Sequence, residues 1–113
     1  QPSIPALDKR MAKAWVNFDG AAITIRDSYN VSSITDNGTG NHTMNFNTAL
    51  ANANYIVSGF IKDGAAASYV RSVSSTDAAT MTTGAVQVYI IAVNAASFTL
   101  FDAGHVQLAV FGN

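Results

Sequence analysis

The chain contains no cysteine, no glutamate and few charged residues of either sign. Without cysteine it can form no disulfide bond, no cysteine-ligated zinc site and no thiol nucleophile. Six Lys and Arg stand against seven Asp, a formal net charge of -1, so the basic surface typical of nucleic-acid-binding proteins is absent. No apolar run in the sequence is long enough to form a membrane-spanning helix. These absences exclude several classes of function but indicate none.

Hydroxyl and amide side chains take the place of the missing charge. Ser, Thr and Asn supply 30 of the 113 residues, whereas charged residues supply only 12%, about half of the usual share. We therefore expect a surface rich in uncharged hydrogen-bonding groups. Among the hydrophobic residues 19 are Ala, so six Phe, four Tyr and one Trp carry much of the core volume. A core of this size gives marginal stability unless partners add burial.

Short runs of alternating apolar and polar residues predict β-strands along the chain. In residues 12–18, small apolar side chains and Phe18 share one face, and Lys13, Trp15 and Asn17 share the other, as in a half-buried strand. Similar runs, separated by Asn, Asp and Gly, predict strands over residues 22–26, 29–35, 42–47, 55–61, 69–73, 80–82, 86–93, 98–101 and 106–111. Residues 55–61 are apolar on both faces, so we expect that strand in the middle of a sheet.

The segment 36–41 reads Asp-Asn-Gly-Thr-Gly-Asn, and Asn and Gly tolerate the positive φ of tight turns. It therefore predicts a hairpin over residues 33–46. Seven to nine short strands, about ten residues apart, predict an all-β fold, an antiparallel β-sandwich of jelly-roll-like form. The strand pattern begins at Ala12, so we expect residues 1–11 to be an N-terminal arm or linker and residues 12–113 to be the β-sandwich domain.

The polar residues with catalytic potential show no arrangement typical of an active site. His42 and His105 lack metal-ligand spacing and are expected to lie beside a turn and at a strand end. Most Asp residues fall at predicted turns, where their side chains bond the local backbone. The segment 38–40 (Gly-Thr-Gly) lies between two strands, unlike a phosphate-binding loop, which opens a helix. We predict no catalytic residue, no metal ligand and no cofactor, and hence no enzyme.

Three aromatic residues are expected opposite the small apolar stripe of their strands: Trp15, Tyr89 and Phe111. One interpretation is a platform on which sugar rings stack. The alternatives are a second core face or a subunit interface, which we favour because a strand with two apolar faces is buried on both sides. We therefore take Trp15, Tyr89 and Phe111 as possible receptor or interface contacts.

Several segments, read together, resemble a known family. They are AKAWVNFDG at residues 12–20, VSSITDNGTG at residues 31–40 and the tail VFGN at residues 110–113. This series resembles a domain of tailed-bacteriophage virion proteins, mostly tail fibres or related structural proteins. The resemblance is continuous over about residues 12–60 and returns at the C-terminus.

The resemblance implies a non-enzymatic component of a bacteriophage particle, a homotrimeric tail fibre or fibre-tip domain involved in attachment to the host surface. The uncharged surface of Ser, Thr and Asn would suit a bacterial surface glycan as partner, because glycans are bound through hydroxyl and amide hydrogen bonds. The protein would be assembled in the host cytoplasm and exposed on the virion, with residues 1–11 contacting other virion proteins and no nucleic-acid binding or membrane insertion. Two alternatives stay open. One is a head fibre, decoration or adaptor protein that binds no receptor, and the other is a free carbohydrate-binding module.

Overall fold

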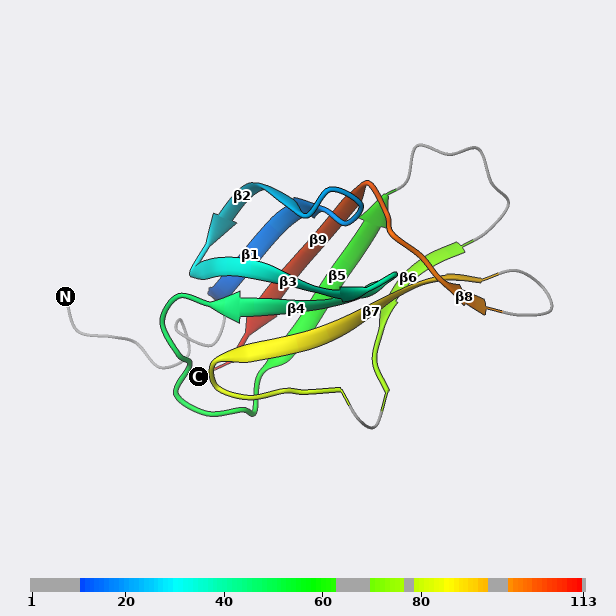
Figure 1. The fold of residues 1–113 in the computed structure, drawn as a ribbon. Helices are drawn as coiled ribbons and strands as arrows, with labels where there is room; N and C mark the ends of the chain where they lie inside the picture. Colours follow the sequence, from blue (N-terminus) through cyan, green and yellow to red (C-terminus); the bar gives the residue numbers. More distant parts are fainter. Residues whose placement is uncertain (1–10, 63–69, 77–78, 94–97, 113) are drawn as a thin grey trace.

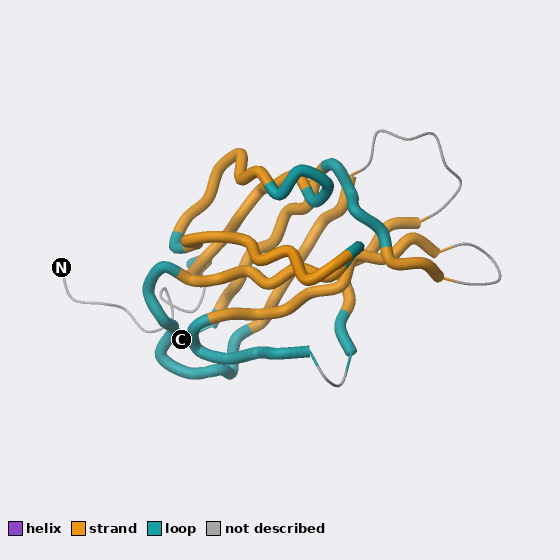
Figure 2. The backbone as a smooth tube through the Cα atoms, in the orientation of Figure 1, coloured by secondary structure: helices purple, strands orange, loops and turns teal. Residues whose placement is uncertain are grey.

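The structure, a computed structural model, describes residues 11–62, 70–76, 79–93 and 98–112. In these ranges it contains nine strands and no helix (Figures 1 and 2). The strands are β1 (Ala12–Asp19), β2 (Thr24–Tyr29), β3 (Val31–Gly38), β4 (Asn41–Phe46), β5 (Ile56–Lys62), β6 (Val70–Ser74), β7 (Ala85–Val93), β8 (Phe98–Leu100) and β9 (His105–Phe111). The predicted N-terminal arm, apart from Met11, lies outside the described residues.

The strands form two antiparallel sheets that pack face to face, which confirms the predicted β-sandwich (Figure 1). Sheet A has the order β2-β1-β9-β5. Sheet B has the order β3-β4-β7-β6, and β8 also pairs with β7. The first and last strands are neighbours in sheet A, where Val16 pairs with Leu108. The first and last strands of the described chain are therefore the two inner strands of sheet A.

The core lies between the sheets and follows the period-two pattern of the sequence. In β7 every second residue is buried, from Val86 to Ala92, and β9 alternates in the same way from Val106 to Val110. The largest completely buried side chains are Phe18, Met44, Ile90, His42, Val16, Val106 and Val110. Alternation alone therefore identified the inward face of the principal strands.

The predicted hairpin is present as β3 and β4, in which Ile34 pairs with Met44. Gly40 at its turn has φ +63, and a Cβ atom there would lie 2.5 Å from the backbone nitrogen of Phe101 and 2.6 Å from the carbonyl oxygen of Ile90. Its backbone also exchanges a hydrogen bond with β7, since the N–H of Ile90 donates to Gly40. Glycine is required here both for the left-handed conformation and for the close approach.

Two predictions about strands were wrong. The strand over residues 55–61 is β5, and it lies at the edge of sheet A instead of in the middle. Its second apolar face, with Ile56 and Phe60, points outward and is exposed. Residues 80–82 form no strand, and only Met81 makes an isolated bridge, to Val86. Apolarity on both faces thus reflects the character of the outer surface of sheet A, and does not indicate a central position.

Candidate functional site

The outer face of sheet A is an unusual surface because it carries large apolar side chains. Ile56 is 69% exposed, Phe60 62%, Tyr29 56% and Trp15 36%, and all four are on strands of this sheet. Phe111 pairs with Ile56 across β9 and β5 and is partly buried. We call these five residues the apolar face. It brings together two of the predicted contact residues, Trp15 and Phe111.

The register of the strands leaves a hollow in the apolar face. Trp15 on β1 pairs with Ala109 on β9, and Ala109 pairs with Ser58 on β5. The side chains of Ala109 and Ser58 are small. A hollow of about 440 Å³ therefore lies between the rings of Trp15 and Phe60. The hollow has the shape to accept a protruding side chain of a partner.

Tyr89, the third predicted contact residue, lies on the other side of the sandwich. It belongs to the outer face of sheet B, where it pairs with Asn41 and is partly buried. The Nε2 amide of Gln87 donates to Tyr89 Oη at 3.3 Å and to Asn41 Oδ1 at 2.8 Å. Tyr89 is therefore part of a hydrogen-bonded polar surface and is separated from Trp15 and Phe111 by the core.

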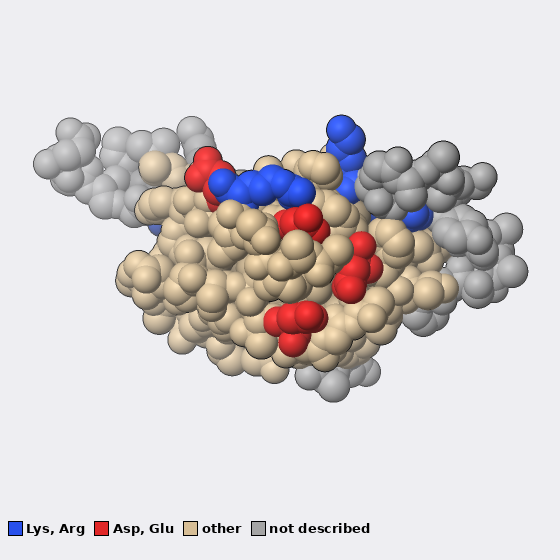
Figure 3. Space-filling view, turned by 45° about the horizontal axis from the view of Figure 1, so that its top comes forward, with Lys and Arg blue, Asp and Glu red and all other residues tan. Residues whose placement is uncertain are grey.

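Amide and hydroxyl side chains continue this polar surface over β3 and β4. The Nδ2 amide of Asn45 donates to Thr35 Oγ1 at 2.8 Å and to Ser33 Oγ at 3.1 Å, and that of Asn37 donates to Thr43 Oγ1 at 2.8 Å. We call this network, with Gln87, Asn41 and Tyr89, the amide lattice. Figure 3 shows charged side chains as separate spots on a largely uncharged surface. The polar groups of the lattice largely satisfy one another across the strands.

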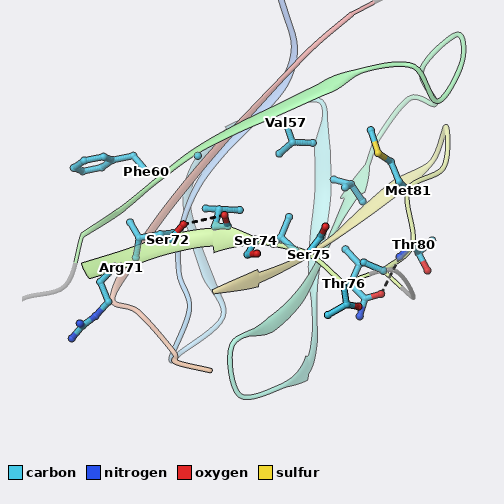
Figure 4. A pocket seen from close by; sticks show the side chains of 16 residues that line it. Val57, Phe60, Arg71, Ser72, Ser74, Ser75, Thr76, Thr80 and Met81 are labelled. Atoms are coloured by element: carbon cyan, nitrogen blue, oxygen red, sulfur yellow. Dashed lines mark hydrogen bonds between the residues drawn. The ribbon is translucent and has the colours of Figure 1, made fainter. Parts of the chain in front are cut away.

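A groove separates the edges of the two sheets, between β5 and β6 (Figure 4). Its volume is about 650 Å³, within the range of ligand pockets. The floor is apolar and includes Val57 and Val88. The sheets approach closely at one point, because a Cβ atom on Gly59 would lie 2.5 Å from Cγ2 of Val73. The groove is therefore shaped by two edge strands that no sequence pattern placed together.

Polar groups line the groove on the side of β6 and the segments that follow it. Five hydroxyl-bearing residues and one amide line it: Ser72, Ser74, Ser75, Thr76, Thr80 and Gln87. Phe60 and Met81 lie at opposite ends in the view of Figure 4. Arg71 is the one charged residue among the described residues of the lining, and its guanidinium lies 4.4 Å from the centre of the Phe101 ring, a cation–π contact. The described part of the lining is thus uncharged apart from one arginine.

His42 is the one buried polar residue in the described core, with no exposed surface. It lies in β4, and its ring packs edge-on against Phe18, with ring centres 5.6 Å apart. Its Nδ1 is 3.9 Å from Asp36 Oδ1 and its Nε2 is 3.6 Å from Asp102 Oδ1. Neither ring nitrogen has a hydrogen-bond partner within the described part of the chain. Because side chains alternate along β4, His42 faces inward with Met44. The expectation that His42 lies beside a turn did not include this burial.

Burial lowers the pKa of His42 below its ordinary value of 6.5, although the carboxylates of Asp102 and Asp36 act in the opposite direction. The His42 side chain is enclosed by the core in this structure. His105 opens β9, as expected for a strand end. In the described residues no group of three or more His, Cys, Asp or Glu side chains is placed to hold a metal ion. The described ranges also contain no helix that could cross a membrane.

The loops that follow β5, β6 and β7 are described only in part. Residues 63–67 and 94–97 lie outside the described residues, as do 77 and 78. Ser74–Thr76 and Ala79 are described and line the groove. No local pattern in the sequence connects this segment with β5, because the edge position of β5 follows from strand pairing.

Comparisons with protein-family models, with curated proteins and with solved structures find no match to this chain. The resemblance to phage virion domains therefore depends on the sequence segments alone.

Proposed function

We propose that this chain is a non-enzymatic structural domain of a bacteriophage particle, a homotrimeric tail-fibre or fibre-tip domain that takes part in attachment to the host surface. The particle itself is inferred from the resemblance of residues 12–20, 31–40 and 110–113 to phage virion domains. The geometry supports the proposal that the chain assembles into an oligomer. A sandwich with one apolar and one uncharged polar outer face suits a protein that buries the first face in an oligomer and exposes the second.

The observation that carries the proposal is the apolar face. Ile56, Phe60 and Tyr29 are each more than half exposed in one chain, yet they lie together with Trp15 on a single sheet. Contiguous exposed apolar surface of this kind marks a contact with another macromolecule. A second and third copy of the chain are the partners we infer, because the small core predicts that additional burial comes from neighbouring subunits.

Three measurements test the proposal. Sedimentation of the full chain is expected to give the mass of three chains, and antibodies against the chain are expected to label the distal end of a fibre in electron micrographs of phage particles. The free protein is expected to compete with phage for adsorption to the host. A monomer that labels no particle would overturn the proposal.

The alternatives predict different results in the same measurements. A head fibre, decoration or adaptor protein would also sediment as a trimer, but it would label the capsid or the connector and would not inhibit adsorption. A free carbohydrate-binding module would sediment as a monomer and would be absent from purified particles.

A further inference from the structure

We propose that the groove between β5 and β6 is a binding site for a neutral oligosaccharide. This inference deepens the proposed attachment function and depends on it. The ligand class follows from three properties of the groove: its size, the hydrogen-bonding capacity of its walls and the small number of charges among its described residues.

The size and the floor of the groove suit a short sugar chain. A volume of about 650 Å³ is large enough for a ligand of more than one ring. The lining residues Val57 and Val88 are apolar, and Met81, which is 43% exposed, lies at one end. Apolar side chains of this kind pack against the C–H faces of pyranose rings, whose hydroxyl groups then point toward the walls.

The hydroxyl groups of the groove differ from those of the amide lattice in one decisive respect. In the lattice, Ser33, Thr35 and Thr43 each accept a hydrogen bond from an asparagine. In the groove, the hydroxyls of Ser75, Thr76 and Thr80 are engaged in no hydrogen bond within the described ranges. These three residues are exposed, so a ligand can replace the water that solvates them. The groove therefore has hydrogen-bond donors and acceptors available for a ligand. In the amide lattice most of these groups already bond one another.

The charge of the lining distinguishes a neutral sugar from other ligands. Among the described residues of the lining there is no carboxylate, so they offer a cation no ligand set. Arg71 is a single cation, and its guanidinium is already stacked on Phe101, which leaves no cluster for a phosphate. A hydroxyl group both donates and accepts, so a row of Ser and Thr side chains matches the hydroxyl groups of a sugar. An extended peptide would instead pair with backbone groups at the free edge of β5 or β6, so a peptide is the comparison ligand in the test.

The test is a titration of the isotope-labelled full chain, followed by backbone amide chemical shifts. The probes are short neutral oligosaccharides of hexoses and N-acetylhexosamines, with a sialylated oligosaccharide and an extended peptide for comparison. We expect at least one neutral probe to produce saturable shifts that are confined to β5, the segment from Val70 to Thr76 and the segment from Thr80 to Val88. Removing both hydroxyls in Ser75→Ala/Thr76→Val is expected to weaken that binding about thirtyfold, since each of the two lost hydrogen bonds contributes about 1 kcal/mol.

The matched control is Thr39→Val/Thr83→Val, which removes two exposed hydroxyls outside the groove lining and should leave binding unchanged. Both sites are at the surface, and thermal unfolding of each variant confirms that it is folded. Three results would overturn the inference: no neutral probe produces shifts, the shifts map to Trp15 or Tyr89, or the peptide binds in the groove instead. Because the isolated protein is titrated, such a failure leaves the trimer and the virion location to be judged by sedimentation and labelling.

Discussion

The Nε2 atom of His42 lies 3.6 Å from Asp102 Oδ1, and the same oxygen accepts a hydrogen bond of 2.7 Å from the backbone N–H of Gly40. Asp102 precedes β9, Gly40 is in the hairpin turn, and His42 is in β4. The Asp102 carboxylate thus links the turn between β3 and β4 in sheet B to the segment that precedes β9 in sheet A. The stability of this junction depends on the charge of a buried histidine.

The stability of the protein should therefore decrease at acidic pH. Burial lowers the pKa of His42 below 6.5 in the folded state, so near that pH the unfolded chain binds more protons and unfolding is favoured as the pH falls. The contribution is fully present above pH 6.5 and is lost as the pH falls below it toward the folded pKa. Urea denaturation between about pH 8 and pH 5 should show a slope of up to about 1.4 kcal/mol per pH unit.

The substitution His42→Leu tests whether His42 is responsible. Leucine cannot titrate, so the variant should lose the slope in this interval while remaining folded in the apolar environment of Phe18. His105→Gln serves as the comparison, because it removes the other histidine of the chain. If His105→Gln removed the slope and His42→Leu kept it, the assignment to His42 would be wrong.

Gly40→Ala should destabilise the fold strongly. An alanine Cβ would lie 2.5 Å from the Phe101 nitrogen and 2.6 Å from the Ile90 oxygen, and the φ of +63 disfavours any L side chain. We expect a loss of about 2 kcal/mol or more in the free energy of unfolding, measured by urea denaturation. The control is Gly84→Ala, where no atom lies within 4 Å of the added Cβ, and it should change stability by about 0.5 kcal/mol or less.

Tyr55→Phe should cost a moderate amount of stability through a single hydroxyl group. Tyr55 Oη donates toward two carbonyl oxygens in the turn before β7, that of Thr82 at 2.7 Å and that of Ala85 at 3.1 Å. Without the hydroxyl these carbonyls lose a partner, and we expect a decrease of about 1–2 kcal/mol in thermal or urea unfolding. Tyr29→Phe, at a residue 56% exposed, should have almost no effect. Equal effects of the two substitutions would contradict the role of the Tyr55 hydroxyl.

Polar substitutions in the apolar face should dissociate the proposed trimer. Trp15→Ser/Ile56→Ser removes two of its large side chains and leaves the lining of the groove intact. Because the lost interface burial favours the free subunit, sedimentation should then give the mass of one chain. The double variant Val70→Ser/Leu100→Ser is the control.

The control residues match the test residues in exposure but belong to sheet B. Val70 is 68% exposed and Leu100 39%, compared with 69% for Ile56 and 36% for Trp15. The control variant should therefore remain trimeric. Dissociation by the control and not by the test variant would place the interface on sheet B instead.

Local pattern was sufficient to predict the strands whose two faces differ in character. In β1 the alternation separates buried Val16 and Phe18 from exposed Trp15, and in β4 it places Met44 in the core. The hairpin was equally accessible, because Asn and Gly in the segment 36–41 specify a tight turn. In each case the deciding interactions are between near neighbours in the chain.

Strand order could not be predicted from local sequence pattern, and the candidate sites depend on strand order. Pairing of β1 with β9 and of β4 with β7 joins residues far apart in sequence, and alternation within a strand does not specify its neighbour. The error over β5 followed from this, since its apolar outer residues belong to a surface and not to a second core layer. The groove was missed for the same reason.

The sequence by itself determined the class of the fold, the inward face of its main strands and the uncharged chemistry of its surface, because composition and period-two alternation are local properties. Only the tertiary structure decided that Trp15 and Phe111 share an apolar face, that Tyr89 lies across the core in a polar lattice, and that β5 and β6 border a groove. Those relationships depend on which strands pair and how the two sheets stack. Long-range packing, rather than any local pattern, fixes both.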